Sequence, residues 1–295
     1  MRFWQCMSYT HPAECVALAR SAEQAGFDGL AMAEHYLYPV NLVSRHPYSP
    51  PDAPAFEAGE FWAELMTTFA AMATVTTRLQ FLSAVHVLPL QNPFYMAKVL
   101  GTLSHLSADR VMLGAGAGWM AEEFEIFGVD FKSRGRRFDE MVALMRTLWA
   151  AGPATFAGEF FRCDQVLMKP EPSRPIPVWI GGKTEVALRR AARIGDGWVG
   201  TGEGLEESIA LATRLQELRR EYGRDHLPFR VLSYQLWGSY DDADLKRMAT
   251  AGITEVGNWV LPFAMGAHQP GLEARQAYLL KTGAEIRARF GWMDE

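Results

Sequence analysis

The feature that most constrains the fold of this chain is a regular alternation of short apolar runs with longer amphipathic segments. Such alternation is typical of repeated strand–helix units around a parallel sheet. The pattern predicts strands at residues 3–7, 29–33, 79–85, 110–113, 178–180, 197–200, 229–236 and 254–260. It predicts helices near residues 13–25, 61–76, 93–106, 134–150, 184–194, 204–222, 241–251 and 272–290. Eight strands, each followed by a helix, favour a single (β/α)8 TIM barrel over a doubly wound sheet.

Two long connections interrupt this rhythm within the 295 residues, which we interpret as one α/β domain spanning 1–295. Residues 35–60 follow the second strand and are rich in proline and aromatic residues. Because active sites of such barrels lie at the C-terminal strand ends, we expect this insertion to act as a lid or pocket wall. Residues 153–177 precede the fifth strand and have phenylalanines around Gly158, as a β-hairpin would. A structural and a functional role for this second insertion remain equally open.

Composition limits the classes of partner. The net charge of -5 and the pI near 5.9 do not indicate binding to nucleic acid or to an anionic membrane surface. No apolar leader opens the chain and no run of 18 apolar residues occurs, so we expect a cytoplasmic protein. Cys6, Cys15 and Cys163 are too few and too dispersed for a disulfide framework and are expected to be reduced. No metal-ligand spacing or serine-nucleophile turn appears, so no metal site is predicted.

Residues 177–198 contain a triplet that resembles the end of a nucleotide-binding P-loop, Gly182-Lys183-Thr184. The first glycine of that loop would fall at Pro177, which has no N–H to offer a phosphate, so the P-loop interpretation fails. A buried strand that turns through glycines into a helix still presents free N–H groups to an anion. A phosphate site and a turn that binds nothing both remain open on these residues alone.

The predicted second strand ends in Glu34 and His35. Histidine is suited to move a proton near neutral pH, and a neighbouring carboxylate can fix its tautomer. A purely structural hydrogen-bonding pair is the alternative, but the position at the mouth of a barrel favours function. His86 lies near the end of the third strand, where alternation does not decide which face it takes.

A glycine-rich turn follows the predicted fourth strand. Gly116, Gly118 and Ala121 fit a relaxed dinucleotide fingerprint, yet that fingerprint belongs in the first strand–helix turn of a Rossmann unit. We therefore interpret the turn as a strand end where the backbone approaches a flat or anionic ligand closely. Four cations follow it, near the start of the next helix: Lys132, Arg134, Arg136 and Arg137. An anionic partner would explain them, and a solvated charge run is the common alternative.

Taken in order, these segments resemble the luciferase-like monooxygenase superfamily, and within it the oxidoreductases that use the deazaflavin coenzyme F420. The resemblance rests on residues 22–35 (AEQAGFDGLAMAEH), 76–129, 134–149 and 178–198, so it covers nearly the whole chain. It implies the barrel already predicted, with the flavin ring stacked in the barrel mouth. It also implies a homodimer.

The resemblance assigns roles by position. His35 matches a histidine near the reactive ring that often donates a proton or contacts the cofactor, and Glu34 stands where aspartate is usual. The bulge behind the ring is matched by Ser83, Ala84 and Val85, with the Ala84–Val85 bond as the candidate for a cis peptide. The segments whose amides hold the cofactor phosphate are matched by Gly181, Gly182, Lys183, Gly200 and Thr201.

One departure bears on the substrate. Members that act on sugar phosphates carry a glutamate acid after the Gly-x-Gly turn, and this chain has Trp119 there. An aromatic wall favours a small apolar or aromatic substrate; its other predicted members are Tyr36, Tyr38, Trp62 and Phe263.

The resulting hypotheses differ in cofactor and chemistry. The first is hydride transfer between coenzyme F420 and the substrate, with His35 as proton donor or acceptor. The second is an FMN-dependent monooxygenase that uses O₂ and receives reduced flavin from a partner reductase. A non-catalytic flavin-binding barrel is the third, and a Rossmann dehydrogenase is a distant fourth. The motifs do not separate coenzyme F420 from FMN.

Overall fold

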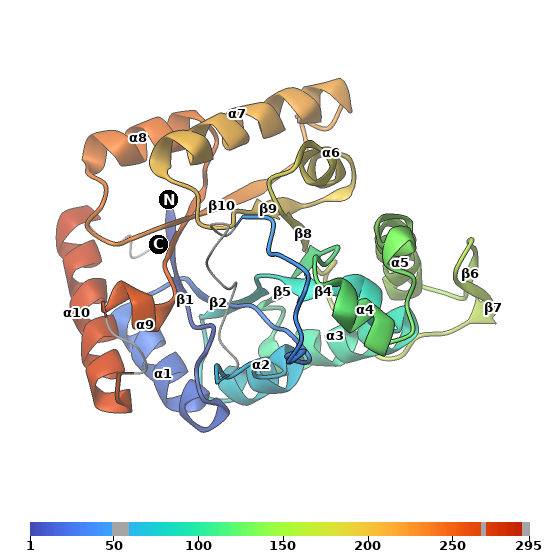
Figure 1. Cartoon of the computed structure of the whole chain (residues 1–295), viewed down its shortest axis with the longest axis horizontal. Helices are drawn as coiled ribbons and strands as arrows, with labels where there is room; N and C mark the ends of the chain where they lie inside the picture. Colours follow the sequence, from blue (N-terminus) through green and yellow to red (C-terminus); the bar gives the residue numbers. More distant parts are fainter. Residues whose placement is uncertain (49–58, 267–269, 291–295) are drawn as a thin grey trace.

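The computed structural model describes residues 1–48, 59–266 and 270–290, and its centre is a closed parallel barrel (Figure 1). The neighbouring strands follow the order β3-β2-β1-β11-β10-β9-β8-β5, and β3 pairs with β5 to close the ring. The predicted (β/α)8 barrel is confirmed. The eight strands are β1 (Arg2–Cys6), β2 (Gly29–Met32), β3 (Gln80–Ser83), β5 (Val111–Gly116), β8 (Val178–Gly181), β9 (Gly197–Val199), β10 (Arg230–Gln235) and β11 (Glu255–Asn258).

The third barrel position is split in two. Strand β3 stops at Ser83, the Ala84–Val85 peptide bond is cis, and the short β4 (His86–Val87) pairs with the end of β5. The Ser83 hydroxyl donates to the carbonyl oxygen of Gly114 at 2.8 Å and accepts from its N–H at 3.0 Å, which ties the two strands together. The cis bond that the family resemblance implied is therefore confirmed, and the predicted strand 79–85 is interrupted by it.

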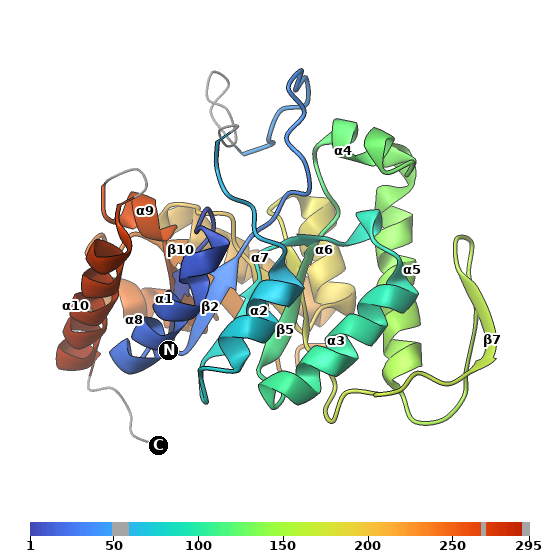
Figure 2. The same cartoon turned by 90° about the horizontal axis from the view of Figure 1, so that it is seen from below.

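A ring of helices surrounds the barrel (Figures 1 and 2). The long helices are α1 (Pro12–Ala25), α2 (Leu65–Ala73), α3 (Pro93–Ser107), α5 (Arg134–Trp149), α6 (Glu185–Ile194), α7 (Leu205–Glu221), α8 (Asp242–Thr250) and α10 (Leu272–Phe290). The short helices, which the sequence did not predict, are η1 (Leu88–Leu90), α4 (Ala121–Ile126), η2 (Phe131–Ser133) and α9 (Leu261–Ala264). Helix α2 begins later than predicted, because the Glu64 side chain caps it by accepting from the N–H groups of Met66 and Thr67.

Large side chains fill the inside of the barrel below its mouth. Trp4, Trp179 and Leu232 are fully buried there, and the Trp4 indole N–H donates to Glu255 at 2.7 Å. The barrel is therefore a packed core, and room for a ligand remains only toward the C-terminal strand ends. Among the helices of the described segments, none combines the length and the apolarity needed to span a membrane.

The second insertion forms the predicted β-hairpin, which consists of β6 (Ala154–Ala157) and β7 (Arg162–Val166). Figure 2 shows it at the side of the barrel, beyond α5. The Glu140 carboxylate on α5 accepts hydrogen bonds of 2.7 to 3.0 Å from the N–H groups of residues 159–161 and so fastens the hairpin to that helix. None of its residues lines the cavity described below, which favours the structural role.

Candidate active site

A cavity of about 1080 Å³ opens at the C-terminal ends of the barrel strands. Ligand pockets usually measure ~300–1,000 Å³, so this volume suits an extended cofactor together with a small substrate. In Figure 2 the segment that follows β2 rises at this same end, beside α4. Side chains that belong to the inner barrel cluster form the cavity floor, namely Cys6, Ala84, Val85, Val199 and Tyr234.

Glycine backbone forms one half of the cavity, around the Val85 side chain. A Cβ atom on Gly116 or Gly181 would lie 2.6 or 2.5 Å from a Val85 methyl group, so neither position has room for a side chain. Gly118 and Gly182 have φ values of +84° and +107°, a region that favours glycine. We call this half the glycine cradle; its predicted members that line the cavity are Gly116, Gly118, Gly181, Gly182, Gly200 and Thr201, with Ala84 and Val85 beneath them.

Lys183, which was also predicted to bind the cofactor, is absent from the described cavity lining, and its polar groups are bound within the protein. Its N–H donates to the Tyr48 hydroxyl at 3.1 Å, so a residue of the first insertion reaches the turn before α6. Its ammonium group forms an ion pair with Glu207 on α7 at 2.8 Å and lies 5.2 Å from the centre of the Tyr48 ring. Of the first insertion, residues 45–48 line the cavity, whereas 49–58 lie outside the described residues.

Ser83 and Thr201, both predicted to bind the cofactor, use their hydroxyl groups within the protein. Ser83 is fully buried between β3 and β5 and is absent from the described cavity lining. Thr201 does line the cavity, but its N–H and its hydroxyl both donate to one oxygen of Glu203, at 2.7 and 2.6 Å. Glu203 itself is buried, and the sequence analysis did not single it out.

Cationic side chains stand beside the cradle. Lys132, Arg134 and Arg190 line the cavity. The Arg134 guanidinium lies 3.8 Å from the centre of the Phe131 ring, and its Nε donates to the carbonyl oxygen of Gly118 at 3.2 Å. Arg190 donates to Asp139 at 2.6 Å. These charges suit an anionic ligand group in this part of the cavity.

Two of the four cations that the sequence grouped lie elsewhere. Arg136 forms an ion pair with Glu159 at the tip of the hairpin. The Arg137 guanidinium lies 4.7 Å from the centre of the Phe160 ring. Arg136 and Arg137 therefore contact the hairpin. Of the four grouped cations, Lys132 and Arg134 line the cavity.

His35 lines the cavity and is held by a glutamate from a distant segment. Its Nδ1 lies 2.9 Å from Oε2 of Glu123, a buried residue in the first turn of α4. The other oxygen of Glu123 accepts from the N–H of Tyr36 at 2.8 Å. The imidazole ring stands edge-on to Trp62 and Trp119, at centroid distances of 5.1 and 5.5 Å. Glu123 thus fixes both the imidazole and the backbone that follows it.

Glu34 does not pair with His35, and this corrects the expectation from the sequence. Its carboxylate forms an ion pair with Nδ1 of His86 and accepts from the N–H of Leu65 at 3.2 Å. Burial alone raises the pKa of Glu34, but the charge of His86 and the hydrogen bonds outweigh it and lower the pKa. Adjacent residues of an extended chain point to opposite sides, so neighbours in sequence diverge here.

Aromatic side chains form the other half of the cavity. Trp62, Trp119 and Phe263 line it as predicted, together with Tyr9 and Trp259, which the sequence analysis did not single out. We call these five residues and His35 the aromatic half. Tyr9 connects two of them, with its ring 4.8 Å from Trp62 and 5.8 Å from Phe263 between centroids.

Tyr36 and Tyr38 were predicted to belong to this wall, but the described cavity lining includes neither of them. The Tyr36 ring packs against Phe127 at 5.3 Å, and its hydroxyl lies 3.3 Å from Nε2 of His86. Tyr36 therefore contacts His86, the partner of Glu34, while Glu34 itself lines the cavity.

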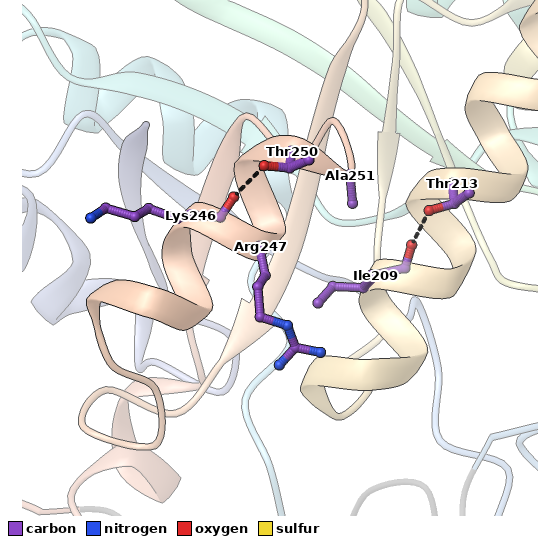
Figure 3. Close-up of a pocket in the computed structure, with 6 residues that line it drawn as sticks. All are labelled: Ile209, Thr213, Lys246, Arg247, Thr250 and Ala251. Carbon is purple, nitrogen blue, oxygen red and sulfur yellow. Dashed lines mark hydrogen bonds between the residues drawn. The ribbon is translucent and has the colours of Figure 1, made fainter.

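A second, shallower hollow of about 440 Å³ lies between α7 and α8 (Figure 3). The hydroxyls of Thr213 and Thr250 donate to carbonyl oxygens of their own helices. Arg247 forms an ion pair with Glu206. The side chains of Thr213, Thr250 and Arg247 are thus engaged with the helices around the hollow.

The sequence model of the luciferase-like monooxygenase family matches residues 3–292. The chain belongs to this family. A relative from Mycobacterium tuberculosis, described as an uncharacterized protein, is 35% identical over 276 residues, 93% of this chain and 95% of that protein. The F420-dependent glucose-6-phosphate dehydrogenase of Intrasporangium calvum is 28% identical over 272 residues, covering 81% of this chain and 77% of the enzyme. The crystal structure of monooxygenase RslO1 from Streptomyces bottropensis shares the fold, with a TM-score of 0.73, 17% identity and 98% coverage of both chains.

Membership of the luciferase-like family makes this chain an oxidoreductase of the flavin or deazaflavin type. The geometry is consistent with that chemistry, because one cavity is lined both by the glycine cradle around Val85 and by a histidine that is fixed by a buried carboxylate.

Proposed function

We propose that this luciferase-like protein is a coenzyme F420-dependent oxidoreductase that exchanges a hydride between the cofactor and a small apolar or aromatic substrate. The observation that carries the proposal is the juxtaposition of the glycine cradle and the aromatic half in one cavity, with His35 in the aromatic half. The 28% identity to an F420-dependent dehydrogenase supports the choice of cofactor. A cellular reductase that regenerates the cofactor and a homodimeric assembly belong to the same proposal.

The residues present fit a flavin-type group. Gly116 and Gly181 make room for the Val85 side chain, which lines the cavity as an apolar surface on which a flat ring could lie. Arg134 at the start of α5 and Arg190 on α6 line the same cavity as the turn before α6, and N–H groups and cations together favour a phosphate. Bound coenzyme F420 supplies the hydride chemistry, and the protein supplies orientation, exclusion of water and a proton.

His35 is the residue that we assign to proton exchange. Its Nδ1 is bound to Glu123, so exchange with a ligand would use Nε2. The carboxylate fixes the tautomer and the ring orientation, as second-sphere partners of catalytic histidines commonly do. Glu123 is thus a positioning residue, whereas Glu34 lines the cavity and is paired with His86.

The aromatic half favours a substrate without a phosphate group. Tyr9, Trp62 and Phe263 present rings to the cavity, and Trp119 stands where sugar-phosphate enzymes of the family carry a glutamate. Apolar walls of this kind bind by contact area and by exclusion of water. A small alcohol, ketone or aromatic carbonyl compound would fit this wall and still offer His35 an oxygen.

An anaerobic assay tests the proposal. The protein is mixed with oxidised coenzyme F420 and a panel of small apolar alcohols, and loss of the cofactor absorbance is followed without O₂. We expect turnover with at least one alcohol, and turnover lower by about 10²–10⁴-fold with the His35→Asn variant at equal cofactor occupancy. Oxygen consumption with reduced FMN, combined with no anaerobic turnover of coenzyme F420, would contradict the proposal and favour the monooxygenase.

A further inference from the structure

The cavity is lined by more cationic side chains than the binding of one phosphate uses. Among the described residues that line it, the cations are Arg45, Lys132, Arg134 and Arg190, which we call the cationic rim. The only carboxylate among those described lining residues is Glu34, and it is paired with His86. The whole chain has 34 acidic and 29 basic residues, so the excess of positive charge belongs to the cavity and not to the protein in general.

The members of the cationic rim come from neighbouring segments. Arg134 donates from Nε to the carbonyl oxygen of Gly118, in the turn between β5 and α4, at 3.2 Å. Arg45 follows Ser44, whose hydroxyl accepts from the N–H of the first residue of α4 at 3.0 Å. Arg190 on α6 donates to a carbonyl oxygen in the first turn of α5 at 3.4 Å. The starts of α4, α5 and α6 therefore gather these charges on one side of the cavity.

This side of the cavity is open to solvent. Lys132 lies two residues before the start of α5, lines the cavity and is exposed. Val186 lies in the first turn of α6, lines the cavity as well and keeps 66% of its surface exposed. Because exposed residues at the start of both helices line the cavity, a ligand bound there can extend to the surface on this side.

Most of the cationic rim has no acidic partner. Arg190 does form an ion pair with Asp139, at 2.6 Å. Within the described ranges, no carboxylate lies at ion-pair distance from Arg45, Lys132 or Arg134. Burial, and after it the charge of Arg190, lowers the pKa of Arg134. The two guanidinium groups therefore repel each other, and bound anions would offset that repulsion.

We propose that the cationic rim binds a second anionic group of the cofactor, in a carboxylate-bearing tail that runs from its phosphate to the surface; this inference rests on the proposed function. Coenzyme F420 carries glutamate carboxylates beyond its phosphate, whereas FMN ends at its phosphate. Arg134 and Arg190 remain the partners of the phosphate. Lys132, which is exposed at the opening, meets the tail, and Arg45 adds charge to the same side.

The test compares coenzyme F420 that carries its glutamate tail with the same cofactor after removal of the glutamates. The dissociation constant of each form is measured at low and at high salt. We expect the wild type to bind the tailed form several-fold more tightly at low salt, and the difference to shrink at high salt because exposed charges are screened. Lys132→Gln should weaken binding of the tailed form about two- to fivefold at low salt and leave the tail-free form unchanged.

Lys281→Gln is the matched control, because it also removes one positive charge from an exposed lysine. Lys281 lies on α10, outside the described cavity lining, with its ammonium group 3.9 Å from Glu285. The affinity of this variant for both forms should equal that of the wild type. The melting temperatures of both variants should stay at the wild-type value, so that a change in affinity reports on the ligand and not on the fold.

Several results would overturn the inference. Equal affinity of the wild type for the two forms at low salt would overturn it and leave the proposed function intact. A Lys132→Gln variant that binds the tailed form as the wild type does, or that weakens both forms equally, would show that Lys132 does not serve the tail. Equal losses in Lys132→Gln and Lys281→Gln would show that only the net charge matters. Failure of the wild type to bind either form would overturn the proposed function and this inference with it.

Discussion

The two halves of the cavity are built by different means. In the glycine cradle the backbone forms the surface, and Gly116 and Gly181 are required because any side chain would collide with Val85. In the aromatic half the surface consists of side chains such as Tyr9 and Trp62, carried by loops after separate strands. A surface made of backbone restricts the sequence and suits a constant cofactor. A surface made of side chains can change while the barrel stays the same, so it suits the choice of substrate.

The largest effect should come from the point where the two halves meet. His35→Asn should lower turnover by about 10²–10⁴-fold because the proton-exchanging group is lost. Glu123→Gln should lower turnover about tenfold or more because the tautomer of His35 is no longer fixed. Both variants should bind cofactor within about twofold of wild type, as measured by titration. Loss of cofactor affinity in either variant would show that His35 belongs to the cofactor site, which would contradict the assignment of separate roles to the glycine cradle and the aromatic half.

Gly181→Ala should damage the cradle specifically. The new Cβ would lie 2.5 Å from a Val85 methyl, and overpacking of this kind costs about 1–3 kcal/mol. We expect cofactor binding to weaken roughly tenfold or more, with a lower melting temperature.

Gly59→Ala is the control, because nothing lies within 4 Å of a Cβ built there. It should leave both affinity and melting temperature unchanged. If Gly181→Ala and Gly59→Ala had the same cofactor affinity and melting temperature, the close contact between Gly181 and Val85 would not be needed for cofactor binding.

Trp62→Ala should damage the aromatic half alone. Its indole packs against His35 and Tyr9, so its removal opens the substrate wall. With a substrate found in the anaerobic assay, we expect the KM to rise roughly tenfold, which corresponds to a loss of about 1.4 kcal/mol of binding free energy. The cofactor dissociation constant should stay unchanged. Parallel loss of cofactor affinity would indicate that the ring extends into the aromatic half.

The smallest effect is expected at Glu122, whose carboxylate anchors the first insertion to α4. Glu122 accepts from the N–H groups of Val43 and Ser44 at 2.8 and 2.7 Å. Burial alone raises the pKa of Glu122, but the hydrogen bonds from Ser44 and Val43 outweigh it and lower the pKa to about 2. A lowered pKa contributes stability above the ordinary value near 4.5, and this stability is lost as the pH falls through about 2.

Glu122→Gln should therefore lower the free energy of unfolding at pH 7 by no more than about 1 kcal/mol, because the carboxylate is partly exposed. The melting temperature should fall slightly as a result. The difference from wild type should narrow when melts are recorded between pH 4.5 and pH 2.5. A difference that widens at low pH would contradict the assigned anchor.

The sequence predicted the barrel because buried parallel strands appear as apolar runs, and it predicted the cradle because glycines are visible where backbone must come close. The partner of His35 could not be found this way, because Glu123 lies 88 residues along the chain. Tyr48 sits in an insertion without periodicity, so no pattern indicates that it reaches Lys183. Tyr234 fell within the predicted strand 229–236 and was not singled out, since a sequence cannot show that a hydroxyl has no partner among the residues that the structure describes.

The most direct test of the central claim is a side-by-side binding titration of the cofactor-free protein with coenzyme F420 and with FMN, followed by quenching of tryptophan fluorescence. Trp119 and Trp259 line the cavity, so a ligand bound there should quench their emission. The account predicts tight, saturable binding of coenzyme F420 and much weaker binding of FMN. Preference for FMN would contradict the deazaflavin assignment, and binding of neither would contradict the cofactor site itself.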